Sequence, residues 1–283
     1  MISDVTLGQY YHKKSFIHSM DARVKIILMI GFIVVAFLAN NVPSILLTVL
    51  STLFFIALSR VPLRLYFKGL GAIWFIILFT AVLNCLYIPG RELFSIWKLT
   101  VTFEGIRQSC IVAARLVCLI LISSILTFTT TPTQLTSAIE SLLAPLKLFG
   151  VKVHDLAMMM TIALRFVPTL LEEAEKIMSA QKARGADLGS GGVISRIKAV
   201  VPILVPLIVS AFRRAYDLAL AMECRCYTDG KGRTRLNPMK IRFRDVFGFI
   251  VAGALAAGII LLRDVPHWSV LLSQAEELIE KYI

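Results

Sequence analysis

Long apolar segments constrain this chain more than any other feature of its sequence. About five of them approach the ~20 residues that cross the apolar core of a bilayer as a helix, and they carry few charges. The chain is 57% hydrophobic and only 17% charged, whereas soluble domains are about 25% charged. The sequence therefore predicts an all-α, multi-pass membrane protein with about five transmembrane helices. The predicted spans cover residues 24–39, 44–58, 69–88, 110–128 and 246–262.

The segment between the fourth and fifth spans has a different pattern. Its residues predict three further helices, at 132–148, 152–184 and 193–227. The two longer helices are apolar in their first halves and charged in their second halves, and prolines interrupt both. They could be two ordinary spans with charged ends. The prolines and the charges favour long helices that lean through the cytoplasmic interface instead.

Basic residues set the predicted orientation. The net charge of +12 comes mostly from residues 60–68 and 147–244, next to apolar spans. This is the distribution of cytoplasmic loops, so a nucleic-acid partner is not expected. Four spans before residue 130 place the N-terminus inside and the C-terminus outside. The predicted regions are an N-terminal membrane region with four spans (1–129), the long cytoplasmic-side helices (130–244), and the last span with a C-terminal tail (245–283).

The two longest predicted helices end in similar sequences. In each, an arginine stands between two small residues: Ala183-Arg184-Gly185 and Cys224-Arg225-Cys226. A guanidinium in this place can simply complement the helix dipole. It can also offer its planar set of donors to a carboxylate on a partner. Two matched copies favour docking as the role of both arginines.

Two other arginines lie inside apolar segments. Arg115 is in the fourth span, and Arg165 closely precedes Pro168. Charges at membrane depth are costly and often functional, so these three residues are candidate structural or coupling residues. Snorkelling to the interface, or a bond to a carbonyl freed by Pro168, explains the arginines equally well.

No set of residues in the sequence suggests catalysis. The four histidines are scattered, and the five cysteines lie mostly in apolar segments, like small core residues. Cys224 and Cys226 could bind a soft metal, but no second pair follows them. Residues 230–234 lack the first glycine of a phosphate-binding loop. The sequence therefore predicts a protein that is not an enzyme and has no cofactor and no metal.

Two functions remain after this exclusion. The chain either docks partners and transmits force, or it acts alone as a secondary transporter or channel. The second function calls for inverted repeats or paired broken helices, and no repeat relates the first four spans to the rest of the sequence.

Short motifs follow one another in order along nearly the whole chain. They are Leu7-Gly8-Gln9-Tyr10, Ile17-His18, Asp21-Ala22-Arg23, Thr127-Phe128-Thr129-Thr130-Thr131-Pro132, Ala144-Pro145-Leu146-Lys147, Ala163-Leu164-Arg165-Phe166-Val167-Pro168, Gln181-Lys182-Ala183-Arg184-Gly185-Ala186 and Ala219-Leu220-Ala221-Met222-Glu223. In this order the motifs closely resemble the T component, the transmembrane coupling subunit, of energy-coupling factor (ECF) transporters. The N-terminal motif is more similar to T components shared by many substrate-binding subunits than to dedicated cobalt or nickel ones.

The resemblance implies a role for each arginine at a helix end. The family carries two Ala-Arg-Gly signatures, and each arginine pairs with acidic side chains in a groove of an ATPase subunit. Arg184 matches the first signature, with Ala183 and Gly185 in place. Arg225 matches the second, but Cys224 and Cys226 replace its alanine and glycine. If the glycine position requires a left-handed backbone, Cys226 is strained there.

The resemblance also implies the partners. They are two homologous ATPases, which hydrolyse the ATP, and a membrane-embedded S component that binds a vitamin or other micronutrient. The expected location is the plasma membrane of a prokaryote, within the lipid bilayer. The choice of substrate belongs to the S component and is not encoded in this chain.

Overall fold

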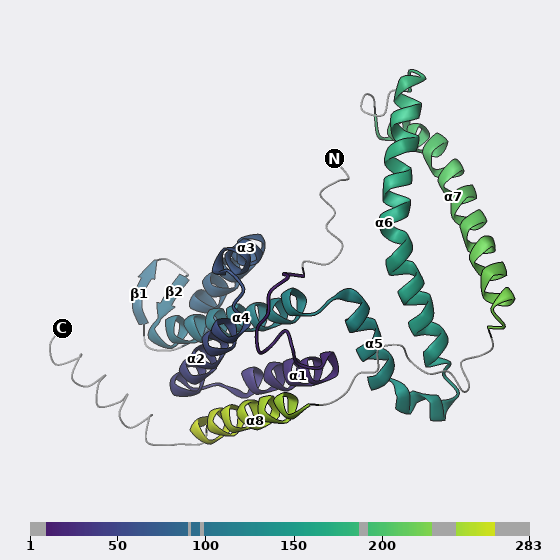
Figure 1. Cartoon of the computed structure of the whole chain (residues 1–283). Helices are drawn as coiled ribbons and strands as arrows, with labels where there is room; N and C mark the ends of the chain where they lie inside the picture. The colour runs from purple at the N-terminus through teal and green to yellow at the C-terminus, as the bar shows by residue number, and fades with distance from the viewer. Residues whose placement is uncertain (1–9, 90–91, 97–98, 187–191, 228–241, 264–283) are drawn as a thin grey trace, which may run out of the picture. The chain divides into compact units, whose positions relative to one another are not determined.

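Helices make up nearly all of the structure (Figure 1). The computed structural model describes residues 10–89, 92–96, 99–186, 192–227 and 242–263. The helices are α1 (Ala22–Leu38), α2 (Val42–Ser59), α3 (Leu63–Tyr87), α4 (Phe103–Thr129), α5 (Pro132–Leu142), the short 3-10 helix η1 (Ala144–Phe149), α6 (Val153–Ala183), α7 (Val193–Cys224) and α8 (Phe243–Arg263). The predicted all-α membrane fold is confirmed. Residues 264–283, which include the predicted C-terminal tail, lie outside the described residues.

A short β-hairpin between α3 and α4 was not predicted. Strand β1 (Glu92–Ile96) pairs antiparallel with β2 (Leu99–Thr102), and Ile96 is the partner of Leu99 in the register. Two strands of this length carry too little alternating pattern to stand out from a loop.

Among the described residues, five helices are long and apolar enough to cross a membrane: α2, α4, α6, the part of α7 from Ala199, and α8. Helix α3 adds a sixth if its two halves, bent by 61°, form one span. Helix α1, the first predicted span, has 17 residues and is slightly shorter than these. The predicted spans thus correspond to α1, α2, α3, α4 and α8. Length and composition alone also admit α6 and α7, which the sequence placed at the interface.

The chain forms two compact units, which are described separately. Helices α1 to α4, the β-hairpin and α8 form the first, here called the bundle, and α5, η1, α6 and α7 form the second, here called the arm. The bundle unit ends at Thr131, and the arm unit begins at Pro132.

Two apolar clusters hold the bundle together at its two ends. One cluster combines the segment before α1 with the end of α2, the start of α3 and the end of α4, and it is built from Ile17, Ile56, Val61, Tyr66, Ile122, Ile125 and Phe128. The other combines the far ends of the same bundle and contains Val35, Ala39, Ile45, Ile111 and Ile259. The N-termini of α1, α3 and α8 therefore lie at the same end as the C-termini of α2 and α4.

Helix α2 packs through small hydroxyl residues. Ser44, Thr48, Ser51, Thr52 and Ser59 are all buried. Each hydroxyl donates to a carbonyl three or four residues earlier in the chain. All five of these buried hydroxyls therefore have a hydrogen-bond partner. Small side chains let helix backbones approach closely, which matters in lipid because burial of apolar surface does not drive helices together there.

Arg115 has a structural role in the bundle. Its guanidinium donates to the carbonyl oxygen of Ala39, the C-cap of α1, and to the side-chain oxygen of Asn40 at 3.0 Å. It therefore closes the end of α1 from the neighbouring α4. This contact is not the predicted bond to a carbonyl freed by Pro168, because its acceptors are at the end of α1.

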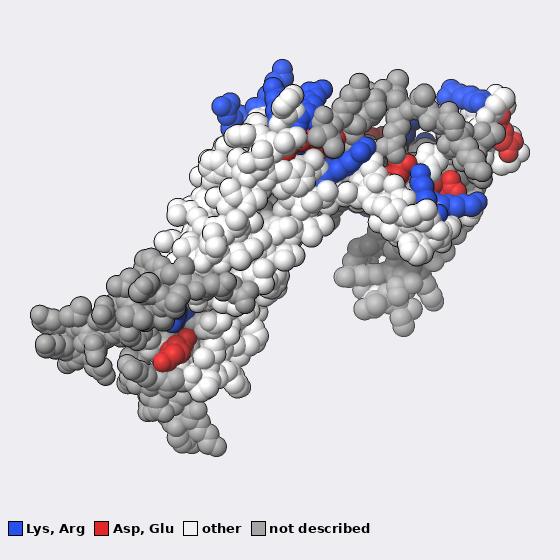
Figure 2. Space-filling view, turned by 90° about the horizontal axis from the view of Figure 1, so that it is seen from below, with Lys and Arg blue, Asp and Glu red and all other residues white. Residues whose placement is uncertain are grey.

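One end of the bundle is strongly basic. The basic residues there are Lys13, Lys14, Arg23, Lys25, Arg60, Arg64, Lys68, Arg242 and Arg244. The view in Figure 2 shows blue side chains gathered at one end of a broad white surface that carries little charge. This asymmetry is the structural form of the basic pattern seen in the sequence.

The first of the three predicted long helices is shorter than expected. The sequence predicted one helix over residues 132–148, but α5 ends at Leu142 and the chain continues as η1. Pro145 lies in the first turn of η1, where its missing N–H would break an α-helical bond to a residue of α5. Gly150, with φ of 79°, ends η1 as expected.

The segment before α1 is anchored by His18. Its Nε2 lies 2.9 Å from the carbonyl oxygen of Tyr11, and its Nδ1 lies 2.7 Å from the hydroxyl of Ser15. A carbonyl can only accept, so Nε2 carries the proton and Nδ1 accepts from Ser15. Burial lowers the pKa of His18 below its ordinary value of 6.5, and the charges of Lys25 and His12 act in the same direction.

This anchoring predicts a pH-dependent stability. The unfolded chain binds a proton at His18 more readily than the folded chain, so stability falls as pH drops through the window below about 6.5. The melting temperature of the purified protein in detergent should fall more between pH 7.5 and 5.5 for the wild type than for His18→Gln. The exposed His12 provides the control, since His12→Gln should keep most of the wild-type difference. An equal fall in all three proteins would contradict the assignment.

Candidate functional site

Helices α6 and α7 form an antiparallel pair within the arm (Figure 1). The carboxylate of Glu173 on α6 accepts from the hydroxyl of Ser210 and from the guanidinium of Arg214 at 2.8 Å, both on α7. Further along, the side chain of Gln181 donates to the carbonyl of Pro202 at 3.4 Å. These contacts fix both the direction and the register of the pair.

The register places unlike halves of the two helices at the same level. The apolar half of α7, residues 199–212, lies level with the charged half of α6, residues 172–184, because Glu173 meets Ser210 and Gln181 meets Pro202. By the same register, the apolar half of α6 lies level with the charged end of α7. Each helix alone is apolar enough to span a bilayer, but the pair has no common apolar zone.

The two helix ends have the same backbone structure. At the end of α6, the N–H of Gly185 donates to the carbonyl of Lys182 and the N–H of Ala186 donates to that of Gln181, each at 3.0 Å. At the end of α7, Cys226 donates to Glu223 at 2.8 Å and Tyr227 donates to Met222 at 3.0 Å. Both ends are Schellman motifs. Arg184 and Arg225 are the C-cap residues and hold equivalent positions.

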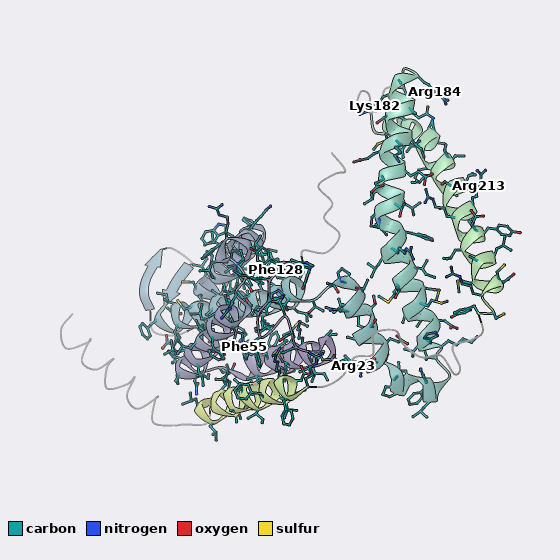
Figure 3. All side chains as sticks on the ribbon, in the orientation of Figure 1. Arg23, Phe55, Phe128, Lys182, Arg184 and Arg213 are labelled. Atoms are coloured by element: carbon teal, nitrogen blue, oxygen red, sulfur yellow. The ribbon has the colours of Figure 1, made fainter. Side chains whose placement is uncertain are left out.

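Both arginines are exposed, and neither guanidinium bonds to another described residue. At each helix end, the backbone bonds of the Schellman motif satisfy two of the last carbonyls without any contribution from the arginine side chain. Ala183 and Gly185 flank Arg184, and Cys224 and Cys226 flank Arg225, and all four are exposed as well. Figure 3 shows Lys182 and Arg184 at the tip of α6. Each arginine is thus free to bind an outside carboxylate.

The antiparallel register separates the two arginines. Arg184 lies eleven residues beyond Glu173, and Arg225 lies eleven residues beyond Arg214, in opposite directions. At about 1.5 Å per residue, their backbones are roughly 30 Å apart along the pair. A single partner site therefore cannot bind both.

Cys226 has the left-handed backbone conformation that, according to the sequence analysis, would strain it. Its φ is 53°, and the equivalent Gly185 has a φ of 84°. A left-handed conformation costs a residue with a side chain about 1–2 kcal/mol, whereas glycine adopts it freely. Both thiols of this signature are free, and Cys224 and Cys226 are exposed.

Arg165 and Pro168 lie within the unbroken helix α6. Arg165 is exposed, and its guanidinium makes no hydrogen bond to another described residue. A bond from this arginine to a carbonyl freed by Pro168 is therefore absent from the described structure. Two features that the sequence analysis considered lie outside the described residues: residues 230–234 and one of the four histidines, His267.

The sequence did not identify the residues that lock α6 to α7. Glu173 lies on one predicted helix, and Ser210 and Arg214 lie on the next. Only a pairing of opposite charges across an antiparallel hairpin could have indicated the contact. A second link joins α5 to α6, where Nδ1 of His154 lies 3.1 Å from Oε1 of Glu140.

Much of the apolar surface of the arm is uncovered. Val201, Val205, Ile208, Phe212 and Tyr216 follow one another at helical spacing on α7 and are all exposed, Phe212 to 73%. Leu148 and Phe149 of η1 are 91% and 85% exposed. Exposed apolar surfaces of this extent mark contacts with a membrane or with another protein.

Comparison with known proteins finds relatives that all belong to transport systems. A family model described as cobalt transport protein (CbiQ) matches residues 13–236. The energy-coupling factor transporter transmembrane protein EcfT of Clostridium kluyveri is 48% identical over 266 residues, which is 93% of this chain and 98% of the relative. The EcfT proteins of Thermosediminibacter oceani and Bacillus subtilis are 45% and 44% identical, each over 93% of this chain and over 99% and 100% of the relative.

The chain belongs to the CbiQ/ECF-transporter T-component family. It is therefore a transmembrane, non-catalytic component of an energy-coupling factor transporter, and the family implies a complex with other subunits. Several long apolar helices agree with a multi-pass membrane protein. The resemblance inferred from short motifs is confirmed.

The matched helix ends predict opposite effects of two substitutions. Cys226→Gly should relieve strain and stabilise the end of α7 by up to about 1 kcal/mol. Gly185→Ala should destabilise the end of α6 by a similar amount, although a Cβ would meet no atom within 4 Å there. Hydrogen exchange at the amides of Tyr227 and Ala186 measures the two effects locally. Slower exchange at Ala186 in Gly185→Ala would refute the strain argument.

Proposed function

We propose that the chain is the coupling subunit of an ECF importer for a vitamin or other micronutrient. In this role it transmits the ATP-driven motion of two ATPase subunits to a membrane-embedded, substrate-binding S component. The observation that carries the proposal is the pair of exposed arginines, Arg184 and Arg225, in matching caps at two ends of one helical pair. ATP hydrolysis takes place in the partner chains.

The separation of the arginines fits two docking sites on two subunits. Each guanidinium would enter an acidic groove on one ATPase and pair with a carboxylate there. Since the caps share one backbone geometry, the two grooves can be similar, as expected for a homologous pair of ATPases. Arg165, Pro168 and Arg115 would serve the structure of the helices that transmit the motion.

The register of α6 and α7 argues against two ordinary spans. A membrane-spanning pair needs apolar residues at the same depth on both helices, and here each apolar half lies beside a charged half. Spanning helices would also place Arg184 and Arg225 on opposite sides of the membrane. A pair lying along the cytoplasmic interface keeps both arginines on one side, where the ATPases are.

The topology of the bundle supports a cytoplasmic arm. The chain leaves the bundle after α4 and returns at α8, and both points are at the basic end. Basic ends of membrane proteins face the cytoplasm. The N-terminus is then inside and the C-terminus outside, in the plasma membrane of a prokaryote.

The exposed apolar stripe of α7 would contact the S component. An S component is itself apolar and lies in the membrane, so it can cover Phe212, Tyr216 and their neighbours without burying unpaired polar groups. When ATP closes the ATPase dimer, the two arginine-capped ends follow the grooves and the angle between α6 and α7 changes. The S component tips as a result and releases its substrate inward.

Charge reversal at either arginine tests the docking role. Arg184→Glu and Arg225→Glu should each weaken the binding of one ATPase by at least about 100-fold, because removing one partner of a desolvated ion pair typically costs about 3–5 kcal/mol. Co-purification of both ATPases with the tagged complex and substrate uptake in reconstituted vesicles measure the effect. Uptake should be lost even where one ATPase remains bound.

Arg213→Glu provides the matched control. Arg213 is an exposed arginine on α7 that lies away from the helix end (Figure 3), so this variant should retain both ATPases. Normal uptake in both Arg184→Glu and Arg225→Glu would refute the docking role. Substrate transport by the purified chain alone in liposomes would instead establish a secondary transporter or channel.

A further inference from the structure

The last turn of α4 is held from several directions at once. The N–H of Tyr11 donates to the carbonyl of Phe128 at 2.9 Å, and the ammonium of Lys25 donates to the carbonyl of Thr129 at 2.8 Å. The ammonium also lies 3.4 Å from the hydroxyl of Thr130. The ring of Phe128 packs edge-on against Tyr66, with centroids 5.3 Å apart. Phe128, Thr129 and Thr130 are all buried.

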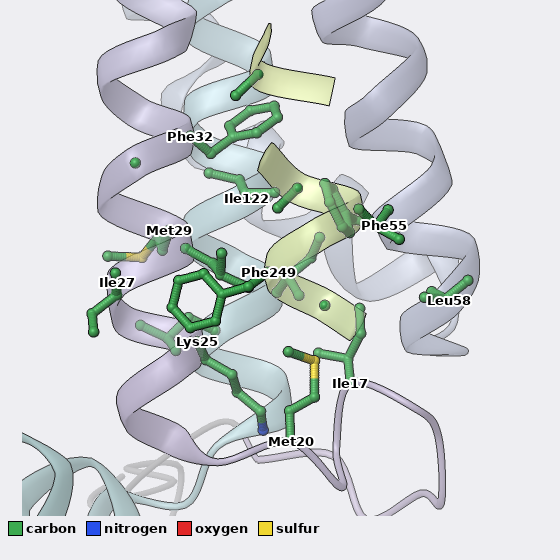
Figure 4. Close-up of a pocket in the computed structure, with 18 of the residues that line it drawn as sticks. Ile17, Met20, Lys25, Ile27, Met29, Phe32, Phe55, Leu58, Ile122 and Phe249 are labelled. Carbon is green, nitrogen blue, oxygen red and sulfur yellow. The ribbon is translucent and has the colours of Figure 1, made fainter. Parts of the chain in front are cut away.

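Lys25, which donates to the carbonyl of Thr129, is a buried lysine. It is only 7% exposed and lies in the first turn of α1. Its stem lines an apolar cavity of about 350 Å³ together with Met20 and Phe249 (Figure 4). A lysine in such surroundings is retained only when its charge is compensated. The carbonyl groups at the end of α4 do so in part, since a helix C-terminus is partly negative.

Two carboxylates add to the compensation of the charge on Lys25. Asp21 and Asp245 interact electrostatically with its ammonium. Asp245 is 2% exposed and accepts from the N–H of Asp21 at 2.8 Å and from that of Arg242 at 2.7 Å. Asp21 in turn caps α1 by accepting from the N–H of Arg23. The N-termini of α1 and α8 and the C-terminus of α4 are thus joined in one polar network.

This network ends where the arm begins. Thr130 is the C-cap of α4 and already has an extended backbone. The bundle unit ends at Thr131, and Pro132 starts α5. In the chain, the arm unit therefore follows directly on an anchored turn of the bundle.

We propose that Lys25 is a positioning residue for transport: it locks the last turn of α4 so that the arm moves about the Thr131–Pro132 connection instead of unwinding α4. The inference rests on the proposed coupling function. With the lock in place, motion of α6 and α7 is delivered to the S component. Without it, the end of α4 yields first and part of the motion is lost.

The test compares Lys25→Met with Lys25→Arg and Lys14→Met in the assembled transporter. Methionine keeps the stem but removes the donors, whereas arginine keeps the charge and donors. Lys14 is exposed and controls for the loss of a basic residue. In Lys25→Met, both ATPases should still co-purify, and the ratio of substrate transported to ATP hydrolysed should fall several-fold. Lys25→Arg should restore much of this ratio, and Lys14→Met should match the wild type.

Hydrogen exchange in the same complexes separates positioning from general stability. Amides of residues 126–131 should exchange about tenfold faster in Lys25→Met, as expected for the loss of a charged hydrogen bond, while the middle of α1 and α2 stays protected. Thr130→Val, which removes only the longer contact, should fold normally and show a smaller effect at the same amides.

Two outcomes would overturn the inference without touching the proposed function. One is an unchanged transport ratio in Lys25→Met with both ATPases bound. The other is faster exchange throughout the bundle, which would make Lys25 a general stabilising residue. Loss of the ATPases from the wild-type complex would instead refute the proposed function itself.

Discussion

Unsatisfied backbone groups at helix ends are the constraint on which this structure depends. In a bilayer, no water is available to these groups, so each helix end needs a partner from the protein. The bundle meets the need with charged side chains: Arg115 closes the end of α1, Lys25 closes the end of α4, and Asp245 joins the starts of α1 and α8. These charged side chains within the apolar bundle therefore form hydrogen bonds that stabilise helix ends.

The arm meets the same constraint in the opposite way. Its two long helices end in Schellman motifs, where backbone N–H groups satisfy two of the last carbonyls of each helix. The side chains of the two C-cap arginines therefore make no capping bond. The helix dipole alone would be the simplest explanation for a cation at a helix C-terminus. Arg184 and Arg225 face solvent with no described partner, and this contrast with Arg115 and Lys25 is the physical basis for assigning them to docking.

The sequence predicted the helices, the basic end and both arginine caps because each depends on local pattern. Apolar length locates spans, and a small residue after a helix-ending arginine indicates a cap. The sequence also indicated that Cys226 could lie at a left-handed position, and its φ is 53°. It did not predict the β-hairpin, since four or five residues carry little periodicity, or the break at Leu143, where Pro145 ends a pattern that otherwise continues as a helix. Neither Lys25 nor Asp245 stood out, because each lies at the edge of an apolar segment, where a charge is ordinary.

The register between α6 and α7 is the feature that the sequence could not supply and that matters most for function. Composition assigns each helix a possible span, and only the pairing of Glu173 with Ser210 and Arg214 shows that their apolar halves are offset. The offset has two consequences that belong together. Apolar surface along α7 stays exposed, where a membrane-embedded partner can cover it. The antiparallel direction also places the two arginines at opposite ends of the pair. One antiparallel contact thus gives the arm an exposed apolar surface and two widely separated arginine-bearing ends, and the proposed coupling role depends on both features.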